Sequence, residues 1–180
     1  QRSSIHIAFR RYVKLLNEMG WTIDKCIKEG LLHLEIEWTK QNFNQAVIAP
    51  ILESTFNASS SKGLDAESQD MYYTILSFTI KNLFGIDDPA TSIDNLVKRI
   101  NDAGFTINKS FSDGLVTKAI LWDEQNFKES IGRLMLKTMY PGVVSFNDLS
   151  TKETQALFES LNANMARVFG ISIQFPTKEN

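Results

Sequence analysis

Apolar side chains recur at helical spacing near the start of the chain and again just past its midpoint. The first series is Ile5, Phe9, Tyr12, Val13, Leu16 and Met19, and Gly20 follows it. The second is Ile93, Leu96, Val97 and Ile100, and Gly104 follows it. Apolar residues three and four apart share one face of a helix, and glycine commonly ends one. The pattern therefore predicts two helices, each stopped by a glycine.

After each glycine the period changes from helical to alternating. Apolar and polar residues alternate over 21–25 and over 32–38, and Lys28-Glu29-Gly30 separates the two runs. The second half of the chain has Ser112-Asp113-Gly114 at the corresponding place. Alternation is typical of half-buried strands, and an Asp-Gly pair between two such runs favours a tight turn. The sequence thus predicts a β-hairpin in each half.

Two further helices follow each predicted hairpin. Apolar residues every four positions mark the first of them: Phe43, Val47 and Ile51, and then Phe127, Ile131 and Met135. Pro50 should kink or restart this helix in the first half, because proline removes a backbone hydrogen bond. The second helix should span about 65–84 and 150–169, with Gly85 and Gly170 as its stops. Alternation over 171–175 predicts a short final strand.

These matching patterns reflect an internal duplication. Tyr12–Phe43 and Leu96–Phe127 are identical at 14 of 32 positions when aligned at an offset of 84 residues. Repetition at a fixed period indicates repeated structural units. The predicted fold class is therefore α+β and helix-dominated. It is a tandem duplication of an αββαα unit, packed as one compact body. Residues 1–88 form the first copy, and 89–180 form the second with a short C-terminal strand.

Both copies contain the motif Trp-x-x-Gln-Asn-Phe, beginning at Trp38 and at Trp122. Two amide side chains beside an indole could bind a peptide or a base through paired hydrogen bonds. A structural role is favoured, because the amides would fall in the first turn of a helix and satisfy free backbone groups. Both indoles should then be buried. The expected clusters are Trp38 with Phe43, Val13, Leu16 and Ile36, and Trp122 with Phe127, Val97, Ile100 and Ile120.

Composition and charge place few limits on function. The chain has 180 residues, 43% of them hydrophobic, and a formal net charge of −2, which gives no overall attraction to nucleic acid or to an anionic membrane. Its single cysteine, Cys26, excludes an internal disulfide and fits a reducing compartment. No apolar run is long enough to span a bilayer. These features predict a cytoplasmic protein.

Chemistry-bearing residues are sparse. His33, Glu35 and Glu37 would share one face of the predicted second strand, but neighbours on such a face are too far apart to converge readily on one ion. We interpret them as a solvated face and predict no metal site. The chain lacks a nucleophile motif, a phosphate-binding glycine loop and metal-spaced cysteines or histidines. The expected protein is not an enzyme and carries no cofactor.

The same strand face in the second copy would hold Thr117, Ala119 and Leu121, which carry no charge. Such a face is either covered by the first copy or offered to a partner. The first functional hypothesis is therefore a non-enzymatic protein–protein interaction module, such as an adaptor, regulator or inhibitor, with these three residues in contact with the partner.

The second hypothesis is a winged-helix-like nucleic-acid-binding protein. Two helices followed by a hairpin, running from the end of the first copy into the second, match the order of a winged helix. Phosphate contacts would come from Arg10, Arg11, Lys14, Lys98 and Arg99. Charge weakens this hypothesis: residues 5–88 hold 8 basic and 11 acidic groups, and residues 89–172 hold 9 of each. Domains that rely on phosphate contacts are usually more basic.

Overall fold

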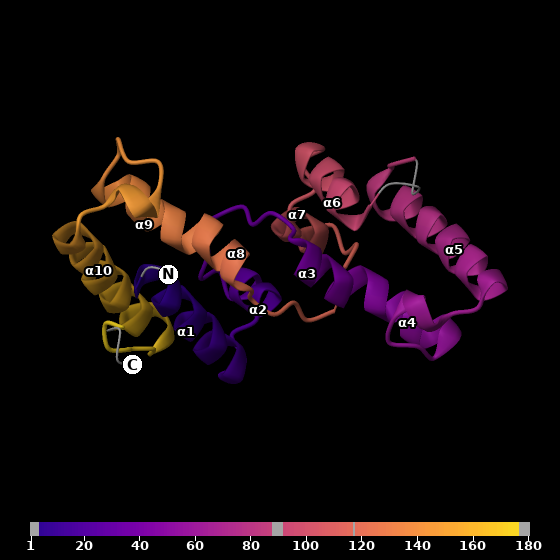
Figure 1. Cartoon of the computed structure of the whole chain (residues 1–180), viewed down its shortest axis with the longest axis horizontal. Coiled ribbons are helices and arrows are strands. Elements are labelled where there is room, and N and C mark those ends of the chain that lie inside the picture. The colour runs from indigo at the N-terminus through magenta and orange to yellow at the C-terminus, as the bar shows by residue number, and fades with distance from the viewer. Residues whose placement is uncertain (1–3, 88–91, 117, 177–180) are drawn as a thin grey trace. The chain divides into compact units, whose positions relative to one another are not determined.

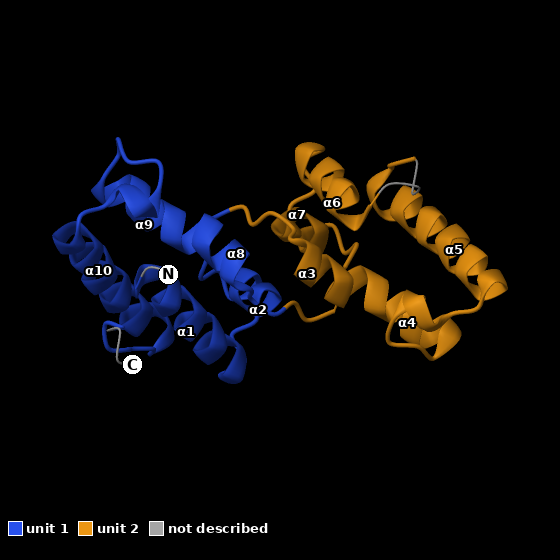
Figure 2. Ribbon diagram, in the orientation of Figure 1, with its two compact units in different colours: residues 1–34, 121–180 blue, residues 35–120 orange. Residues whose placement is uncertain are grey.

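A computed structural model describes residues 4–87, 92–116 and 118–176 (Figure 1). The chain forms two compact units (Figure 2). Unit 1 consists of residues 1–34 and 121–180, and unit 2 consists of residues 35–120. Unit 2 is thus one continuous stretch of chain, whereas unit 1 is assembled from the two ends of the chain.

Helices build both units. Unit 1 contains α1 (Ser4–Glu18), α2 (Ile23–Lys28), α8 (Glu124–Phe127), the π-helical turn η3 (Lys128–Gly132), α9 (Arg133–Met139), the 3₁₀ turn η4 (Phe146–Asp148) and α10 (Thr151–Phe169). Unit 2 contains α3 (Lys40–Phe43), the π-helical turn η1 (Asn44–Ile48), α4 (Ala49–Phe56), the 3₁₀ turn η2 (Ser61–Gly63), α5 (Ala66–Phe84), α6 (Ile93–Asp102) and α7 (Ile107–Ser112).

Each unit combines parts of both sequence copies. In unit 1, α1 and α2 come from the first copy, and α1 contacts α8 and α10 of the second. In unit 2, α3 to α5 come from the first copy, and α3 contacts α6 of the second. Each sequence copy therefore contributes its first part to one unit and its second part to the other, which is an exchange of helices within one chain. The division into 1–88 and 89–180 remains a division of the sequence, and its boundary lies outside the described residues.

The predicted α+β class and its hairpins are wrong, because the part of the chain that the structure describes contains no β-strand. The first run of each predicted hairpin is instead a short helix, α2 or α7, which begins after Thr22 or Thr106. Gly30 has φ +69°, but it ends α2 rather than turning a hairpin. The Leu31 N–H donates to the Cys26 carbonyl at 3.0 Å, which is the Schellman pattern of a helix C-terminus.

In the first copy, residues 35–38 of the second predicted run bond to helices rather than to a strand. Along 35–38 the side chains alternate between exposed and buried, with Ile36 and Trp38 buried. The Asn101 side chain on α6 accepts from the Trp38 N–H at 2.8 Å and donates to the Trp38 carbonyl at 2.9 Å. The Asn108 side chain accepts from the Ile36 N–H at 2.8 Å. An asparagine amide offers one donor and one acceptor side by side, as a peptide group does.

Unit 1 repeats this contact at the equivalent position. The Asn17 side chain on α1 donates to the Trp122 carbonyl at 3.0 Å and accepts from the Trp122 N–H at 2.9 Å. Asn17 and Asn101 are 84 residues apart, as are Trp122 and Trp38. In each unit, therefore, an asparagine of one copy holds the tryptophan backbone of the other copy.

The interruption of the following helix does not require Pro50. A π-helical turn lies at the same place in both copies, η1 before Pro50 and η3 before Leu134. Such a turn adds a residue to the helix, which fits the four-residue recurrence of apolar positions. In unit 1 the turn ends at Gly132, where a Cβ atom would lie 2.9 Å from the Phe9 ring. Close packing of α1 against this turn requires that glycine.

The longer helices match their predicted limits. α10 begins at Ser150 with a reciprocal capping box to Glu153, and Gly85 and Gly170 end α5 and α10 with φ of +66° and +70°. The predicted final strand is wrong: residues 171–176 follow an irregular path against α10. Phe175 lies with its ring 5.0 Å from that of Phe158, and the Ile173 N–H donates to the Asn162 side chain at 3.0 Å.

The two tryptophans are buried as expected, each 2% exposed. Their rings meet Phe43 and Phe127 edge-on, at 5.8 and 6.0 Å between centroids. The expected helix partners are wrong, because of the exchange between copies. Trp38 lies in unit 2 with the helix that carries Val97 and Ile100, and Trp122 lies in unit 1 with the helix that carries Val13 and Leu16.

Candidate functional site

The candidate site is an apolar groove on unit 1. Two helical segments and one extended segment form it: η3 with α9, α10, and residues 31–34. The groove has a volume of about 400 Å³. Ile131, Leu134 and Met135 line it from η3 and α9, and Leu161, Met165 and Val168 line it from α10. Leu31, Leu32 and Leu34 complete the lining from the first copy.

The floor of the groove is buried and its edges are open to solvent. Leu161 and Met165 are 1% and 2% exposed, whereas Leu134 is 48% exposed. Thr138 and Asn164 supply polar groups at the edge. Of the described residues that line the groove, His33 alone has an ionisable side chain, and it is exposed. The groove therefore offers a ligand mainly aliphatic and methionine side chains, with no charged pair among the described residues that line it.

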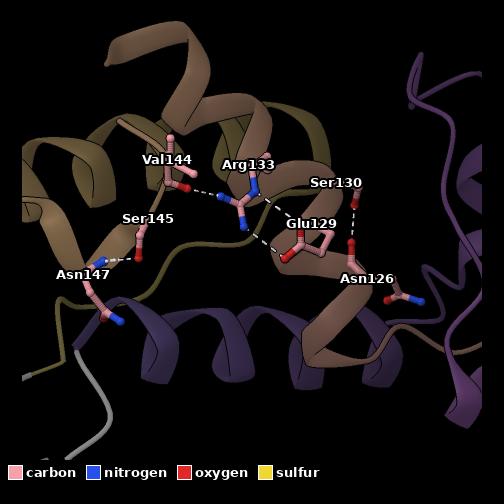
Figure 3. Close-up of polar contacts among 7 residues, drawn as sticks. All are labelled: Asn126, Glu129, Ser130, Arg133, Val144, Ser145 and Asn147. Carbon is pink, nitrogen blue, oxygen red and sulfur yellow. Dashed lines mark hydrogen bonds and ion pairs between the residues drawn. The ribbon is translucent and has the colours of Figure 1, made fainter. Parts of the chain in front are cut away.

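Contacts on another side of α9 hold this helix in place (Figure 3). The Arg133 guanidinium forms an ion pair with Glu129 at 3.1 Å and donates to the Val144 carbonyl in the loop after α9. It also lies over the Phe146 ring, 5.3 Å from the centroid. These contacts tie η3, α9 and the following loop together. Leu134, the next residue along, is thus presented from a fixed helix.

Unit 2 carries a groove at the corresponding positions of the repeat. Val47, Pro50 and Ile51 stand where unit 1 has Ile131, Leu134 and Met135. Likewise Leu115 and Val116 correspond to Leu31 and Leu32, and Leu83 corresponds to Val168. This groove is smaller, with a volume of about 290 Å³.

The two grooves differ in charge at one edge. Lys118 occupies the position of Leu34, and its Nζ lies 3.8 Å from the Glu53 carboxylate. An ion pair at the edge keeps water near that end of the unit 2 groove. The groove of unit 1 is therefore the larger and the more apolar of the two.

The repeated Trp-x-x-Gln-Asn-Phe motif has a structural role at its asparagine. Asn42 is 0% exposed, and its side chain accepts from the Thr39 N–H at 2.8 Å. The Thr39 hydroxyl accepts from the Asn42 N–H in return, at 3.2 Å. Asp123 and Asn126 form the same reciprocal capping box at the start of α8. The asparagines thus begin helices, whereas Gln41 and Gln125 are exposed.

Residues suited to acid–base or metal chemistry do not gather in a site within the described parts of the chain. Among the described residues, no group of three His, Cys, Asp or Glu side chains is placed to hold a metal ion. Glu35, on the expected solvated face, accepts from the Thr106 hydroxyl at 2.5 Å. Burial raises the pKa of the Cys26 thiol to about 11, so this group stays protonated and unreactive near neutral pH.

The three residues proposed for partner binding on a strand face are described only in part. Thr117 lies outside the described residues. Ala119 is exposed in unit 2, and Leu121, which is 42% exposed, belongs to unit 1. The strand that would have aligned them is not formed. Contact of either residue with a partner stays a prediction.

The five basic residues of the nucleic-acid hypothesis fall on two helices of different units. Arg10, Arg11 and Lys14 lie on α1 of unit 1, and Lys98 and Arg99 lie on α6 of unit 2. Carboxylates neutralise part of the first group: Arg10 is 3.7 Å from Glu124, and Lys14 is 3.9 Å from Glu18. The expected wing is a helix, α7. Nucleic-acid binding stays a prediction without the wing that motivated it.

The groove is not predicted from the sequence. Leu32 and Leu34 fall in the predicted second strand of the first copy, and Leu134 and Met135 fall in a predicted helix of the second copy. Nothing local indicates that they meet.

Known proteins offer no guide to the groove. No family model, curated protein or solved structure matches this chain. Within the described residues, no helix has the length and apolar character needed to cross a bilayer.

Proposed function

We propose that this protein is a non-enzymatic interaction module that binds an amphipathic helix of another protein in the groove of unit 1. The observation that carries the proposal is the groove itself: an apolar channel between two helical segments, with Leu134 48% exposed at its edge. Amphipathic helices bind such grooves by inserting apolar side chains at three- and four-residue spacing. Large apolar side chains left open to solvent at a groove often mark an interaction site.

Two methionines in the lining support a peptide ligand. Met135 lies half-buried on one side of the groove, and Met165 forms part of the floor. Methionine side chains are flexible and polarisable, and they adapt to differently shaped partners. The groove could therefore adapt to a helix with leucine, isoleucine or phenylalanine at its contact positions.

Charge near the groove favours an acidic partner. The exposed Lys137 and Arg167 lie beside groove residues on α9 and α10, and the Arg167 side chain donates to Asn164 at the groove edge at 3.0 Å. Unit 1 holds 12 Lys and Arg against 10 Asp and Glu, whereas unit 2 holds 7 against 11. Acidic residues flanking the apolar face of the partner helix would be attracted to this unit.

The proposal includes a reducing compartment, the cytoplasm. Cys26 is the only cysteine of the chain, and it is buried and free. The fold is thus built without a disulfide, which suits a compartment that keeps thiols reduced.

A site-specific photo-cross-linking experiment tests the proposal. A photoreactive amino acid replaces Leu134 in the full chain, and the matched control replaces Val144, which is 80% exposed in the same unit but outside the groove. We expect a discrete protein adduct from position 134 only, and its loss when Met135→Glu is added. Peptide mapping of the adduct should identify an acidic amphipathic helix.

Two results would overturn this proposal. One is equal labelling of the same proteins from both positions, because the groove would then confer no preference. The other is an adduct with lipid or another small apolar molecule alone, which would identify the groove as a small-molecule site.

A further inference from the structure

The outer face of α5 in unit 2 carries large apolar side chains that its own unit leaves open. Met71 and Phe78 are 52% and 68% exposed, and Ile75 between them is half-buried. Residues spaced by four and then three positions lie along one stripe of a helix. The core of unit 2 takes a different face of α5, that of Tyr72, Leu76, Ile80 and Phe84.

The equivalent helix of unit 1 has no such stripe. At the positions that correspond to Met71, Ile75 and Phe78, α10 has Ala156, Ser160 and Ala163. Both helices have 19 residues and matching caps, so their geometry does not account for the difference. The stripe is a property of α5 that folding of the unit does not explain.

Charges beside the stripe are arranged with opposite signs at its two ends. Glu67 and Asp70 precede Met71, and Lys81 follows Phe78. Positions 67, 70, 74 and 81 fall on one side of the stripe at helical spacing, and all are exposed. Lys81 already lies 3.0 Å from Asp87, but this pair is on the surface and such pairs contribute little.

This arrangement is complementary to itself when the helix is reversed. Turning a second α5 about a twofold axis between Thr74 and Ile75 brings Met71 opposite Phe78 and brings Lys81 beside the acidic end. A surface that fits its own copy in this way forms an isologous contact, the usual basis of a closed dimer. Same-side charges meet in an antiparallel helix pair, so the two acidic ends would each face a lysine.

We propose that two copies of this chain associate through antiparallel pairing of their α5 helices, with Met71 and Phe78 of each copy at the centre of the contact. A contact made by one helix from each copy is small, so the dimer is weak and depends on concentration. The surface lies in unit 2, whereas the groove proposed above lies in unit 1. The two proposals therefore stand or fall separately.

Sedimentation of the full chain over a wide concentration range tests for the dimer. We expect a reversible monomer–dimer equilibrium, weakened at least about tenfold in Kd by Phe78→Glu. Ala163→Glu, at the equivalent position of α10, is the matched control and should leave the equilibrium unchanged. Lys81→Glu should weaken association, and adding Glu67→Lys and Asp70→Lys to it should restore association. A chain that stays monomeric at every concentration would overturn the proposal, and so would a dimer that Phe78→Glu leaves intact.

Disulfide trapping tests the antiparallel arrangement independently. Ile75→Cys lies close to the twofold axis, so two copies of this variant should cross-link under mild oxidation. Ser68→Cys and Asn82→Cys lie towards opposite ends of the helix, and neither should cross-link with itself, but a mixture of the two should. The native Cys26 is buried and does not compete. Self-cross-linking at positions 68 and 82 would show a parallel pair and refute this arrangement.

Discussion

Trp38 and Trp122 occupy equivalent buried positions, but their indole N–H groups differ in hydrogen bonding. The Trp122 Nε1–H donates to the Trp21 carbonyl at 2.9 Å. The Trp38 Nε1–H is buried and finds no hydrogen-bond partner among the described residues. A buried donor without a partner loses its hydration and gains nothing in return. The two indoles therefore pack alike, but only the burial of the Trp122 N–H is compensated by a hydrogen bond within the described chain.

Substitution of each tryptophan by phenylalanine should reveal that difference. Both changes remove the same part of the ring system, but only Trp122→Phe also breaks a hydrogen bond. We expect Trp122→Phe to reduce the free energy of unfolding by about 1 kcal/mol or more beyond the loss from Trp38→Phe. Denaturant unfolding of the two variants measures this. Equal losses would mean that the Trp122 hydrogen bond contributes nothing net.

Residue-level features that depend on local rules could be predicted from the sequence. Burial of Trp38 and Trp122, the capping box of Ser150 with Glu153, and the glycine stops at Gly85 and Gly170 all follow from neighbours a few positions away. The roles of Asn17 and Asn101 could not be predicted in the same way. Each of them contacts backbone 63 or more residues distant, and no local pattern reports such a contact.

At the scale of elements, the asparagine contacts explain how an extended segment is held without a sheet. Backbone groups removed from water need partners, and strands usually supply them to one another. Here Asn101 supplies both bonds to Trp38, and Asn17 supplies both to Trp122. Asn108 adds a third bond in unit 2, from the Ile36 N–H. In each unit, asparagine side chains of one copy therefore hold the backbone of the other copy.

Asn101→Ala should destabilise unit 2, because it leaves the N–H and the carbonyl of Trp38 without partners. We expect a loss of about 1–3 kcal/mol in the free energy of unfolding. Asn95→Ala, an exposed change on the same helix, is the control and should have little effect. Urea unfolding followed by tryptophan fluorescence measures both. A loss no larger than that of the control would show that water replaces the amide readily.

The hairpin prediction failed because short segments satisfy two patterns at once. Ile23, Cys26 and Ile27 are spaced as on a helix, while residues 21–25 alternate as on a strand. Thr106 resolves the ambiguity in the second copy: its side chain accepts from the Lys109 N–H and so begins α7. Along 35–38 the side chains alternate between exposed and buried as the pattern suggests, but the predicted strand is wrong, because this segment bonds to asparagine side chains on helices instead of to a second strand.

At the scale of the whole molecule, the exchange of helices makes the chain a covalent version of a swapped dimer. Each unit needs the first part of one copy and the second part of the other. The sequence revealed the duplication clearly, but both the exchanged and the unexchanged arrangement satisfy the same pattern. The choice between these two arrangements depends on how the segments pack in three dimensions, which a local sequence pattern does not report.

Fragments of the chain test the exchange directly. The continuous fragment 35–120 contains all of unit 2 and should unfold cooperatively, with helical circular dichroism. The fragment 1–88 contains one complete sequence copy but neither complete unit, so it should lack a cooperative transition. Thermal denaturation of the two fragments is the measurement. Cooperative unfolding of 1–88 together with an unfolded 35–120 would show that the copies fold independently.

The discontinuous make-up of unit 1 also determines the order in which the protein can fold as it leaves the ribosome. Unit 2 is complete once residue 120 has emerged, whereas α1 must wait for α8 and α10. During that interval Phe9 and Tyr12, which are fully buried in the finished protein, have no partners from the second copy. Apolar surface exposed during synthesis is what chaperones bind. Helix α1 is thus made before unit 2 but is covered after it.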